Sequence, residues 1–105
     1  MNRHPNIPES AWEFLTEVIR YDGVEGLILF GSRAFGDHEE RSDIDVAVCG
    51  PSISRGDWSK IRDAADAARS LYWISLVHFE RNPPTLRKRI ADTGIQIYDG
   101  PKTSR

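Results

Sequence analysis

The chain has 105 residues and a mass of 11.9 kDa, which is the size of one compact domain and leaves little room for two. Its apolar share of 39% excludes intrinsic disorder, and its net charge of −2 argues against general polyanion binding through counterion release. The single cysteine, Cys49, excludes an internal disulfide and fits a reducing compartment. No export signal or membrane-spanning run is present, so we expect a cytoplasmic domain.

The first predicted elements are a helix and a buried strand. Ser10 is expected to cap a helix that runs to about Tyr21, where apolar residues recur at helical spacing. The apolar run from Val24 to Phe30 is bounded by turn residues and is too short for a free-standing helix, so it predicts a buried strand. Gly31 ends this strand, and Ser32 is placed to cap the one or two helical turns that follow.

The rest of the chain predicts strands alternating with helices, which is typical of an α/β (α+β) protein. The expected elements are a strand from Ser42 to Cys49, a helix capped by Asp57 and ending near Leu71, a strand from Trp73 to Phe79, a helix opened by Asn82-Pro83-Pro84 and ending near Thr93, and a strand from Ile95 to Tyr98. No linker divides these elements. We expect a flexible arm at residues 1–9, one domain at residues 10–99 and a flexible tail at residues 100–105.

Asp43 and Asp45 are the first candidate functional residues. Side chains two residues apart in a strand point to the same face, so both carboxylates share one surface. Two like charges at this spacing repel unless water, a cation or an arginine lies between them. An Asp-x-Asp pair is also typical of a solvated strand end, so the pair by itself does not identify a site.

Gly31 and Ser32 precede this pair and directly follow the predicted buried strand. A glycine lets a phosphate approach the backbone closely, the serine offers a hydroxyl, and the free amides of a helix start attract an anion. Alone, Gly31-Ser32 is equally consistent with an ordinary capped turn. Together with two carboxylates, which suit a hard divalent ion such as Mg²⁺, the pattern favours a site for a triphosphate and its metal.

The stretch LILFGSRAFGDHEERSDIDVAV resembles the minimal nucleotidyltransferases of the DNA polymerase β-like superfamily. The pattern of that family is an apolar strand, Gly-Ser, a spacer and Asp-apolar-Asp. Gly31, Ser32, Asp43 and Asp45 occupy those places, and Arg33 also fits. The C-terminal half, with Asn-Pro-Pro followed by a Leu-Arg helix, is similar to the family as well.

This resemblance covers roughly residues 24 to 98 and implies a small mixed β-sheet backed by helices. It implies transfer of a nucleoside monophosphate from a nucleoside triphosphate, such as ATP, to a hydroxyl of a partner protein or RNA, with release of pyrophosphate. The site residues that it implies are Gly31, Ser32 and Arg33 for the nucleotide, and Asp43 and Asp45 for catalysis and for the Mg²⁺ cofactor.

One position departs from the family pattern. The family usually supplies a third carboxylate from the next long strand, in a Val-Asp-Leu-Val-like context, whereas this chain has Ile-Ser-Leu-Val with Ser75 at the acidic position. A neutral serine removes a metal ligand and the expected base for the incoming hydroxyl. On a regular strand, the side chains of His78 and Glu80 point to the face opposite Ser75. Only a bulge or an early strand end would place either of them on the same face as Ser75.

Several other side chains have two interpretations. Arg33 could bind phosphate or pair with the acidic loop that follows it. The residues Trp12, Trp58 and Trp73 could stack on a base, although core packing is the commoner role in a small domain. The basic patch from Arg87 to Arg89 could be a solvated helix face, or it could contact RNA, a nucleotide or an acidic partner.

Three functions stay open for this sequence. A transferase must hold two substrates in line, and the chain is too short for a second domain that would position an acceptor. In the family a helical protein of the HEPN type often accompanies the minimal transferase, in some cases as a toxin that the transferase neutralises, and a homodimer is the other arrangement. An enzyme of this kind is favoured over a non-catalytic nucleotide-binding module that inhibits a helical partner, which Ser75 motivates, and over an RNA-binding accessory. Neither membrane nor DNA binding is expected.

Overall fold

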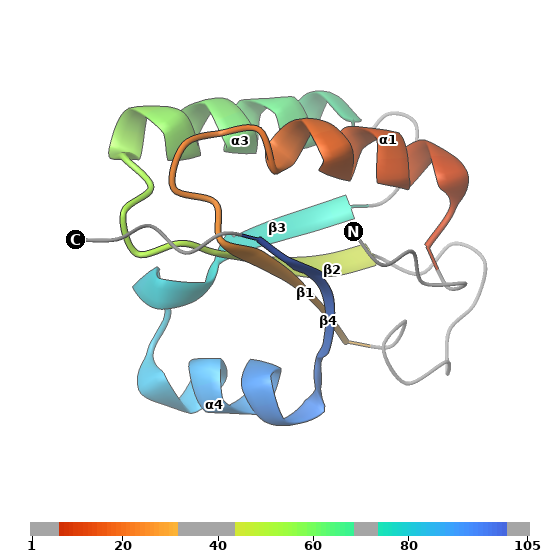
Figure 1. Cartoon of the computed structure of the whole chain (residues 1–105). Coiled ribbons are helices and arrows are strands. Elements are labelled where there is room, and N and C mark those ends of the chain that lie inside the picture. Colours follow the sequence, from red (N-terminus) through yellow and green to blue (C-terminus); the bar gives the residue numbers. More distant parts are fainter. Residues whose placement is uncertain (1–6, 32–43, 69–73, 101–105) are drawn as a thin grey trace.

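The computed structural model describes residues 7–31, 44–68 and 74–100. Its centre is a four-stranded sheet in the order β3-β2-β1-β4. Helices α1 (Glu9–Val18) and α3 (Arg55–Ala68) lie on one face of this sheet, and α4 (Pro84–Thr93) lies on the other (Figure 1). Within the described ranges, no helix has the length and apolar composition that a membrane crossing requires.

The sheet is mixed, which confirms the expected fold class. Strand β1 (Gly26–Phe30) runs antiparallel to both of its neighbours, β2 (Ile44–Cys49) and β4 (Ile95–Asp99). Strand β2 runs parallel to the edge strand β3 (Ile74–His78). A parallel pair requires a crossover connection, and α3 supplies it by passing over one face of the sheet.

Two predicted helix caps are wrong. Helix α1 begins at Glu9 with no side-chain cap, so Ser10 lies inside the helix. Helix α3 begins before Asp57, and the Ser54 hydroxyl accepts a hydrogen bond from the Asp57 N–H at 3.0 Å. Ser54 is thus the cap, because its oxygen reaches an amide that has no partner inside the helix. Helix α4 has proline in its first turn and ends before Gly94, both as predicted.

Two strand ends also differ from the prediction. Strand β1 begins at Gly26 rather than Val24, since its pairing with β2 starts there. Strand β3 ends at His78, and Phe79 opens the short 3₁₀ helix η1 (Phe79–Arg81), which leads to α4. The helical turns expected after Ser32 lie outside the described residues.

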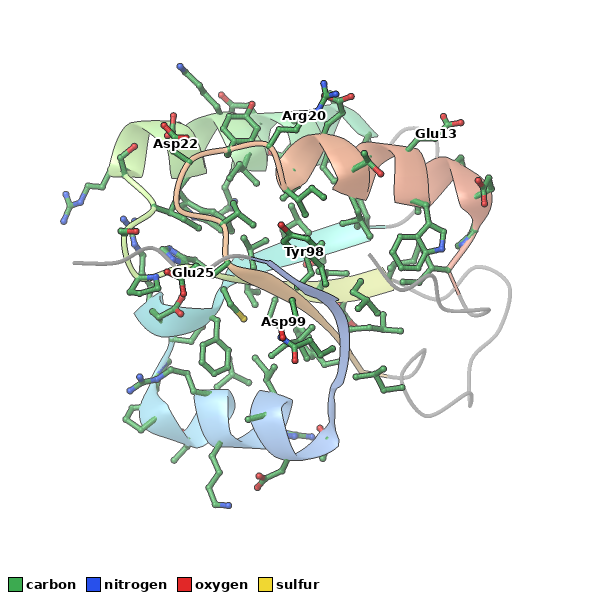
Figure 2. All side chains as sticks on the ribbon, viewed as in Figure 1. Glu13, Arg20, Asp22, Glu25, Tyr98 and Asp99 are labelled. Carbon is green, nitrogen blue, oxygen red and sulfur yellow. The ribbon has the colours of Figure 1, made fainter. Side chains whose placement is uncertain are left out.

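The core lies between the sheet and the layer formed by α1 and α3. Successive strand residues alternate between the two faces, and those that face α1 and α3 are almost fully buried. Trp12 and Trp58 pack in this core, at 2% and 9% exposure, which supports the structural interpretation of both; Trp73 lies outside the described residues. Figure 2 shows Glu13 and Arg20 on the outer surface of the helical layer. The strand residues of the core are Leu27, Leu29, Ile44, Val46, Val48, Ile74, Leu76 and Ile97.

The opposite face of the sheet is covered more thinly. Among the described elements, α4 is the one helix on this side (Figure 1). Ile28 and Phe30 of β1 point to it and are only half-buried, and Ile90 is the single fully buried residue of α4. Part of this face is therefore accessible, and Asp45 lies on it.

Candidate functional site

Gly31 and Asp45 meet on the α4 side of the sheet. Asp45 is the register partner of Phe30, so its side chain stands beside the end of β1, where Gly31 follows. Gly31 has φ +76°, a left-handed conformation that favours glycine. A Cβ atom built on Gly31 would lie 2.5 Å from Oδ2 of Asp45, so the carboxylate occupies the space that any other side chain would need. The glycine of the expected phosphate turn and one carboxylate of the expected metal pair are therefore in direct contact.

Three of the expected site residues, Ser32, Arg33 and Asp43, lie outside the described residues. Their roles stay predictions, as does the alternative pairing of Arg33 with the acidic loop. Across residues 7–31, 44–68 and 74–100, no three His, Cys, Asp or Glu side chains gather as a metal site. Metal binding at Asp45 would therefore need further ligands, of which Asp43 is the expected one.

Ser75 lies next to Asp45 across the parallel pair of β2 and β3. The two residues are register partners, so their side chains point to the same face of the sheet, and both are half-buried. The position at which the family pattern leads us to expect a third carboxylate is thus adjacent to Asp45. It carries a neutral hydroxyl in this chain.

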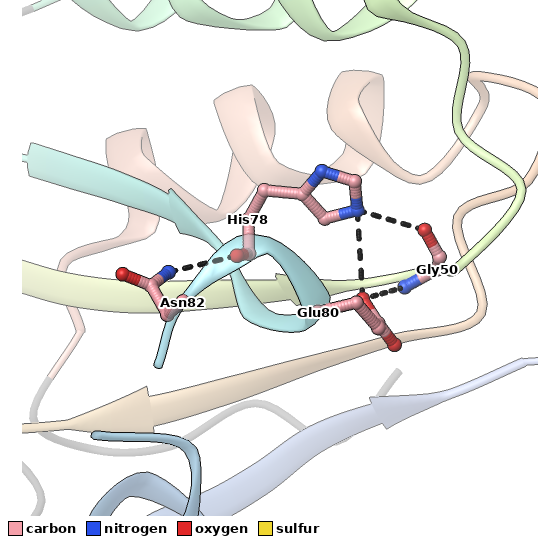
Figure 3. Close-up of polar contacts among 4 residues, drawn as sticks. All are labelled: Gly50, His78, Glu80 and Asn82. Atoms are coloured by element: carbon pink, nitrogen blue, oxygen red, sulfur yellow. Dashed lines mark hydrogen bonds and ion pairs between the residues drawn. The ribbon is translucent and has the colours of Figure 1, made fainter. Parts of the chain in front are cut away.

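His78 and Glu80, the two candidate substitutes for that carboxylate, both lie away from Ser75. His78 packs on the opposite face at 4% exposure, and its Nε2 lies 2.8 Å from the carbonyl oxygen of Gly50. Glu80 lies beyond the strand end in η1, where its Oε1 accepts a hydrogen bond from the Gly50 N–H at 2.9 Å and lies 3.5 Å from Nε2 of His78 (Figure 3). These contacts join the ends of β2 and β3, about 10 Å along the strand from Ser75. The early end of β3 therefore does not bring an acid to Asp45.

A cavity of about 370 Å³ opens between α4 and the end of β1. Four residues of α4 face it at helical spacing, and Gly31 lines it directly after the end of β1. The Thr93 hydroxyl donates a hydrogen bond to the carbonyl oxygen of Arg89 at 2.6 Å. Because Gly31 both lines the cavity and contacts Asp45, the cavity adjoins the carboxylate. The lining residues are Phe30, Gly31, Leu86, Arg89, Ile90 and Thr93.

The basic patch of α4 consists of three side chains with different surroundings. Lys88 pairs with Asp92 at 2.7 Å, and the hydrogen bond and negative charge of Asp92 raise the pKa of Lys88. Arg87 is half-buried, and its Nε has no hydrogen-bond partner among the residues that the structure describes. Arg89 is exposed and lines the cavity. The patch is therefore not one uniform cationic surface, and Arg89 is its link to the candidate site.

The sequence does not identify Leu86, Arg89 and Thr93 as three residues that line one cavity. The available signal was their spacing of three and four residues on a predicted helix, which places them on one stripe. That spacing does not say what the stripe faces. The stripe lies opposite Gly31 because η1 and the residues between η1 and α4 direct the chain to that face of the sheet.

Comparison with known protein families agrees with this geometry. Residues 14–103 match the family model described as "Polymerase beta, Nucleotidyltransferase". The chain belongs to this family. The match contains both Gly31 and Asp45, and it confirms the resemblance inferred from the Gly-Ser and Asp-apolar-Asp motifs. A search of curated protein sequences gave no match.

Solved structures share the fold of this nucleotidyltransferase-family chain. A toxin-antitoxin complex with AMP-PNP aligns with a TM-score of 0.65 and 21% identity, over 83% of this chain and 72% of the other. A mutant of the toxin-antitoxin pair MntA-HpeT aligns with a TM-score of 0.64 and 18% identity, over 89% of this chain and 74% of the other. A complex of a tri-AMPylated HEPN toxin from Shewanella oneidensis with its MNT antitoxin aligns with a TM-score of 0.56 and 20% identity, over 86% of this chain and 67% of the other. At these identities the likeness establishes the fold.

Proposed function

We propose that this domain transfers a nucleoside monophosphate from a nucleoside triphosphate, with ATP as the first choice, to a hydroxyl of a partner protein or RNA. The acceptor oxygen bonds to the α-phosphorus, the bond from that phosphorus to the bridging oxygen breaks, and pyrophosphate leaves. The residues assigned to this reaction are Gly31, Ser32 and Arg33 for the triphosphate, and Asp43 and Asp45 for Mg²⁺ and catalysis.

The observation that carries this proposal is the contact between Gly31 and Asp45. A left-handed glycine lets polyphosphate oxygens approach the backbone, and the carboxylate beside it supplies a negative oxygen for the counter-ion of those phosphates. Both residues lie on the accessible face of the sheet. One substrate can therefore touch the turn and the metal ligand at the same time.

The residues present suit Mg²⁺, because carboxylate and phosphate oxygens are the hard ligands that this ion prefers. When bound, the ion neutralises charge on the phosphates and makes the attacking hydroxyl more acidic. The Asp45 carboxylate lies against Gly31, so it is placed beside the turn that would receive the phosphates. Ser75 offers no carboxylate beside Asp45, so this position supplies no base for the acceptor proton.

The nature of the acceptor is proposed from the structural relatives. Those relatives are described as toxin-antitoxin complexes, one with AMP-PNP and one with a tri-AMPylated HEPN toxin. We extend this to the present chain as an antitoxin of the cytoplasm that attaches AMP to a helical toxin of the HEPN type. In this proposal the partner brings its own hydroxyl into line with the α-phosphorus.

The test uses the full chain with Mg²⁺ and triphosphates labelled at the α-phosphate, and offers a helical protein of the HEPN type or RNA as the acceptor. Label should appear on the partner with the natural chain and fall about a hundredfold or more with Asp45→Asn, since a charge-stabilising group at the phosphates is lost. Asp66→Asn removes an exposed carboxylate of α3 as the matched control. Unchanged transfer by Asp45→Asn would contradict the proposal.

Ser75 favours one alternative, a non-catalytic module that binds nucleotide and holds or inhibits a helical partner. The site then keeps a carboxylate and the glycine turn but has no acid at the adjacent register position. Measurable binding of Mg-ATP, with no transfer of label to any protein or RNA acceptor, is the expected result for such a module. Transfer of label that requires Asp45 would exclude it.

A further inference from the structure

The cavity between α4 and β1 has more apolar wall than phosphate binding requires. Phe30, Leu86 and Ile90 form its apolar sides, and its volume of about 370 Å³ falls in the range of small-molecule pockets, which runs from about 300 to 1,000 Å³. Phosphate oxygens gain nothing from such walls, because they lose hydration there. The cavity therefore suits an uncharged part of a ligand with a largely apolar surface.

Two polar side chains from the last turns of α4 complete the lining. The Thr93 hydroxyl uses its hydrogen in the bond to the Arg89 carbonyl oxygen, so its own oxygen offers only lone pairs to a ligand. The Arg89 guanidinium offers only donors. In the described part of the chain no carboxylate pairs with Arg89, so its donors are available to a ligand. A matching ligand must present a donor and an acceptor on a body that fills the apolar space.

We infer that this cavity binds the base and ribose of the nucleoside triphosphate, with Arg89 and Thr93 as residues that determine nucleotide specificity. A nucleoside has a flat apolar body whose edge carries both donors and acceptors. Gly31 lines the cavity and contacts Asp45, so phosphates at Asp45 and a nucleoside in the cavity belong to one continuous ligand. The inference rests on the proposed function for the position of the phosphates.

Four variants at lining residues and one control separate the nucleoside site from the phosphate site. Leu86→Trp fills the cavity at a half-buried position, and Arg89→Gln removes the charged donors; each should weaken Mg-ATP binding about tenfold or more. Thr93→Val removes the acceptor and keeps the shape, whereas Thr93→Ser retains the hydroxyl, so the nucleotide preference should change in the first and not in the second. Lys88→Gln removes an equal charge from a residue that does not line the cavity.

Calorimetry with three probes tests the inference. Mg-ATP spans both sites, magnesium tripolyphosphate occupies the phosphate site alone, and adenosine occupies the cavity alone; GTP, CTP and UTP then rank the bases. Leu86→Trp and Arg89→Gln should weaken Mg-ATP and leave tripolyphosphate unchanged, while Lys88→Gln changes neither. In methyl NMR spectra, ATP and adenosine should shift the signals of Leu86, Ile90 and Thr93, and tripolyphosphate should not.

The possible failures are distinguishable. If tripolyphosphate binds in an Asp45-dependent manner but the cavity variants bind Mg-ATP normally, the nucleoside assignment is wrong and the proposed function stands. If adenosine shifts the α4 methyl signals but tripolyphosphate does not bind, the cavity assignment stands and the proposed phosphate site is wrong. If neither ATP nor adenosine shifts those signals, the cavity does not bind a nucleoside, and the inference is overturned.

Discussion

The two faces of the sheet differ: one forms the buried core, and the other carries the candidate site. The face under α1 and α3 presents a continuous apolar surface, in which Leu27 and Leu29 have no exposed area. The face under α4 carries Asp45 and Ser75 beside half-buried Ile28 and Phe30. Neighbouring residues of a single strand thus serve different purposes, because strand geometry sends them to opposite sides.

This difference shows why a small domain can keep a polar site on its central strands. Two helices cover one face and supply most of the burial, whereas the ten residues of α4 form the one helix on the other face among the described elements. The uncovered part leaves the carboxylate of Asp45 within reach of solvent and of a ligand. Stability and binding should therefore respond to different substitutions.

The largest effect on stability is expected from Leu29→Ala. This side chain has 0% exposure in the sealed core, so the substitution removes buried methyl groups and leaves a cavity that costs about 2–5 kcal/mol. Ile28→Ala, on the adjacent residue facing α4, should cost about 1 kcal/mol because the side chain is only half-buried. Urea unfolding of both variants measures the difference. Equal losses would show that the two faces do not differ as described.

Two glycines with positive φ allow effects on stability to be separated from effects on nucleotide binding. Gly23 (φ +88°) and Gly31 (φ +76°) should each lose about 1–2 kcal/mol of stability on change to Ala, since a Cβ is strained in this conformation. Only Gly31→Ala displaces the Asp45 carboxylate, so only this variant should also lose Mg-ATP binding. Gly56→Ala, where a Cβ would make only an ordinary contact of 4.0 Å with the Ser54 hydroxyl oxygen, is the control for both. Equal nucleotide affinity in Gly23→Ala and Gly31→Ala would refute the role given to Gly31.

Glu80→Ala tests the contact that joins the ends of β2 and β3, away from Asp45. The variant leaves the Gly50 N–H without its acceptor and should cost about 1–2 kcal/mol in the free energy of unfolding. Glu80→Gln keeps an acceptor oxygen and should cost less. Because this contact lies away from Asp45, Mg-ATP affinity measured by calorimetry should not change in either variant. A loss of affinity would mean that Glu80 acts at the nucleotide site after all.

Ser75→Asp restores the acid that the family pattern leads us to expect. Without metal, the new carboxylate faces Asp45 across the strand pair and should lower stability by about 0.5–1 kcal/mol through like-charge repulsion. With Mg²⁺, the same pair should bind the ion about tenfold more tightly, which raises the melting temperature relative to the metal-free variant. An identical Mg²⁺ affinity in the variant and the natural chain would show that Ser75 does not adjoin the metal.

Local sequence patterns predicted the elements better than their ends. The run from Val24 to Phe30 predicts a strand from its apolar residues, yet β1 begins only at Gly26, where β2 is present to pair with it. Ser54 replaces Asp57 as the cap of α3, because several polar residues before a helix can reach the same amides. Strand ends and caps are decided by tertiary partners that a local pattern does not contain.

For the candidate site, too, the sequence patterns predict some features and not others. Strand parity correctly separates His78 from the Asp45 face, and the two motifs correctly bring Gly31 and Asp45 into contact. The cavity under α4 escapes prediction because its walls come from residues more than 50 positions apart, such as Phe30 and Leu86, and no short-range spacing links them.

The smallest effect is expected from Lys88→Gln on the exposed side of α4. Asp92 raises the pKa of Lys88 in the folded state, so the stability from this pair is present below the ordinary lysine pKa. It is lost as the pH rises through the raised value. Thermal melts should show little difference between variant and natural chain at neutral pH, because an exposed pair contributes little, and none at strongly alkaline pH. Mg-ATP affinity should be unchanged at neutral pH, since Arg89 rather than Lys88 lines the cavity. A clear loss of affinity in Lys88→Gln would show that the basic residues of α4 act together, and would remove the distinction drawn between them.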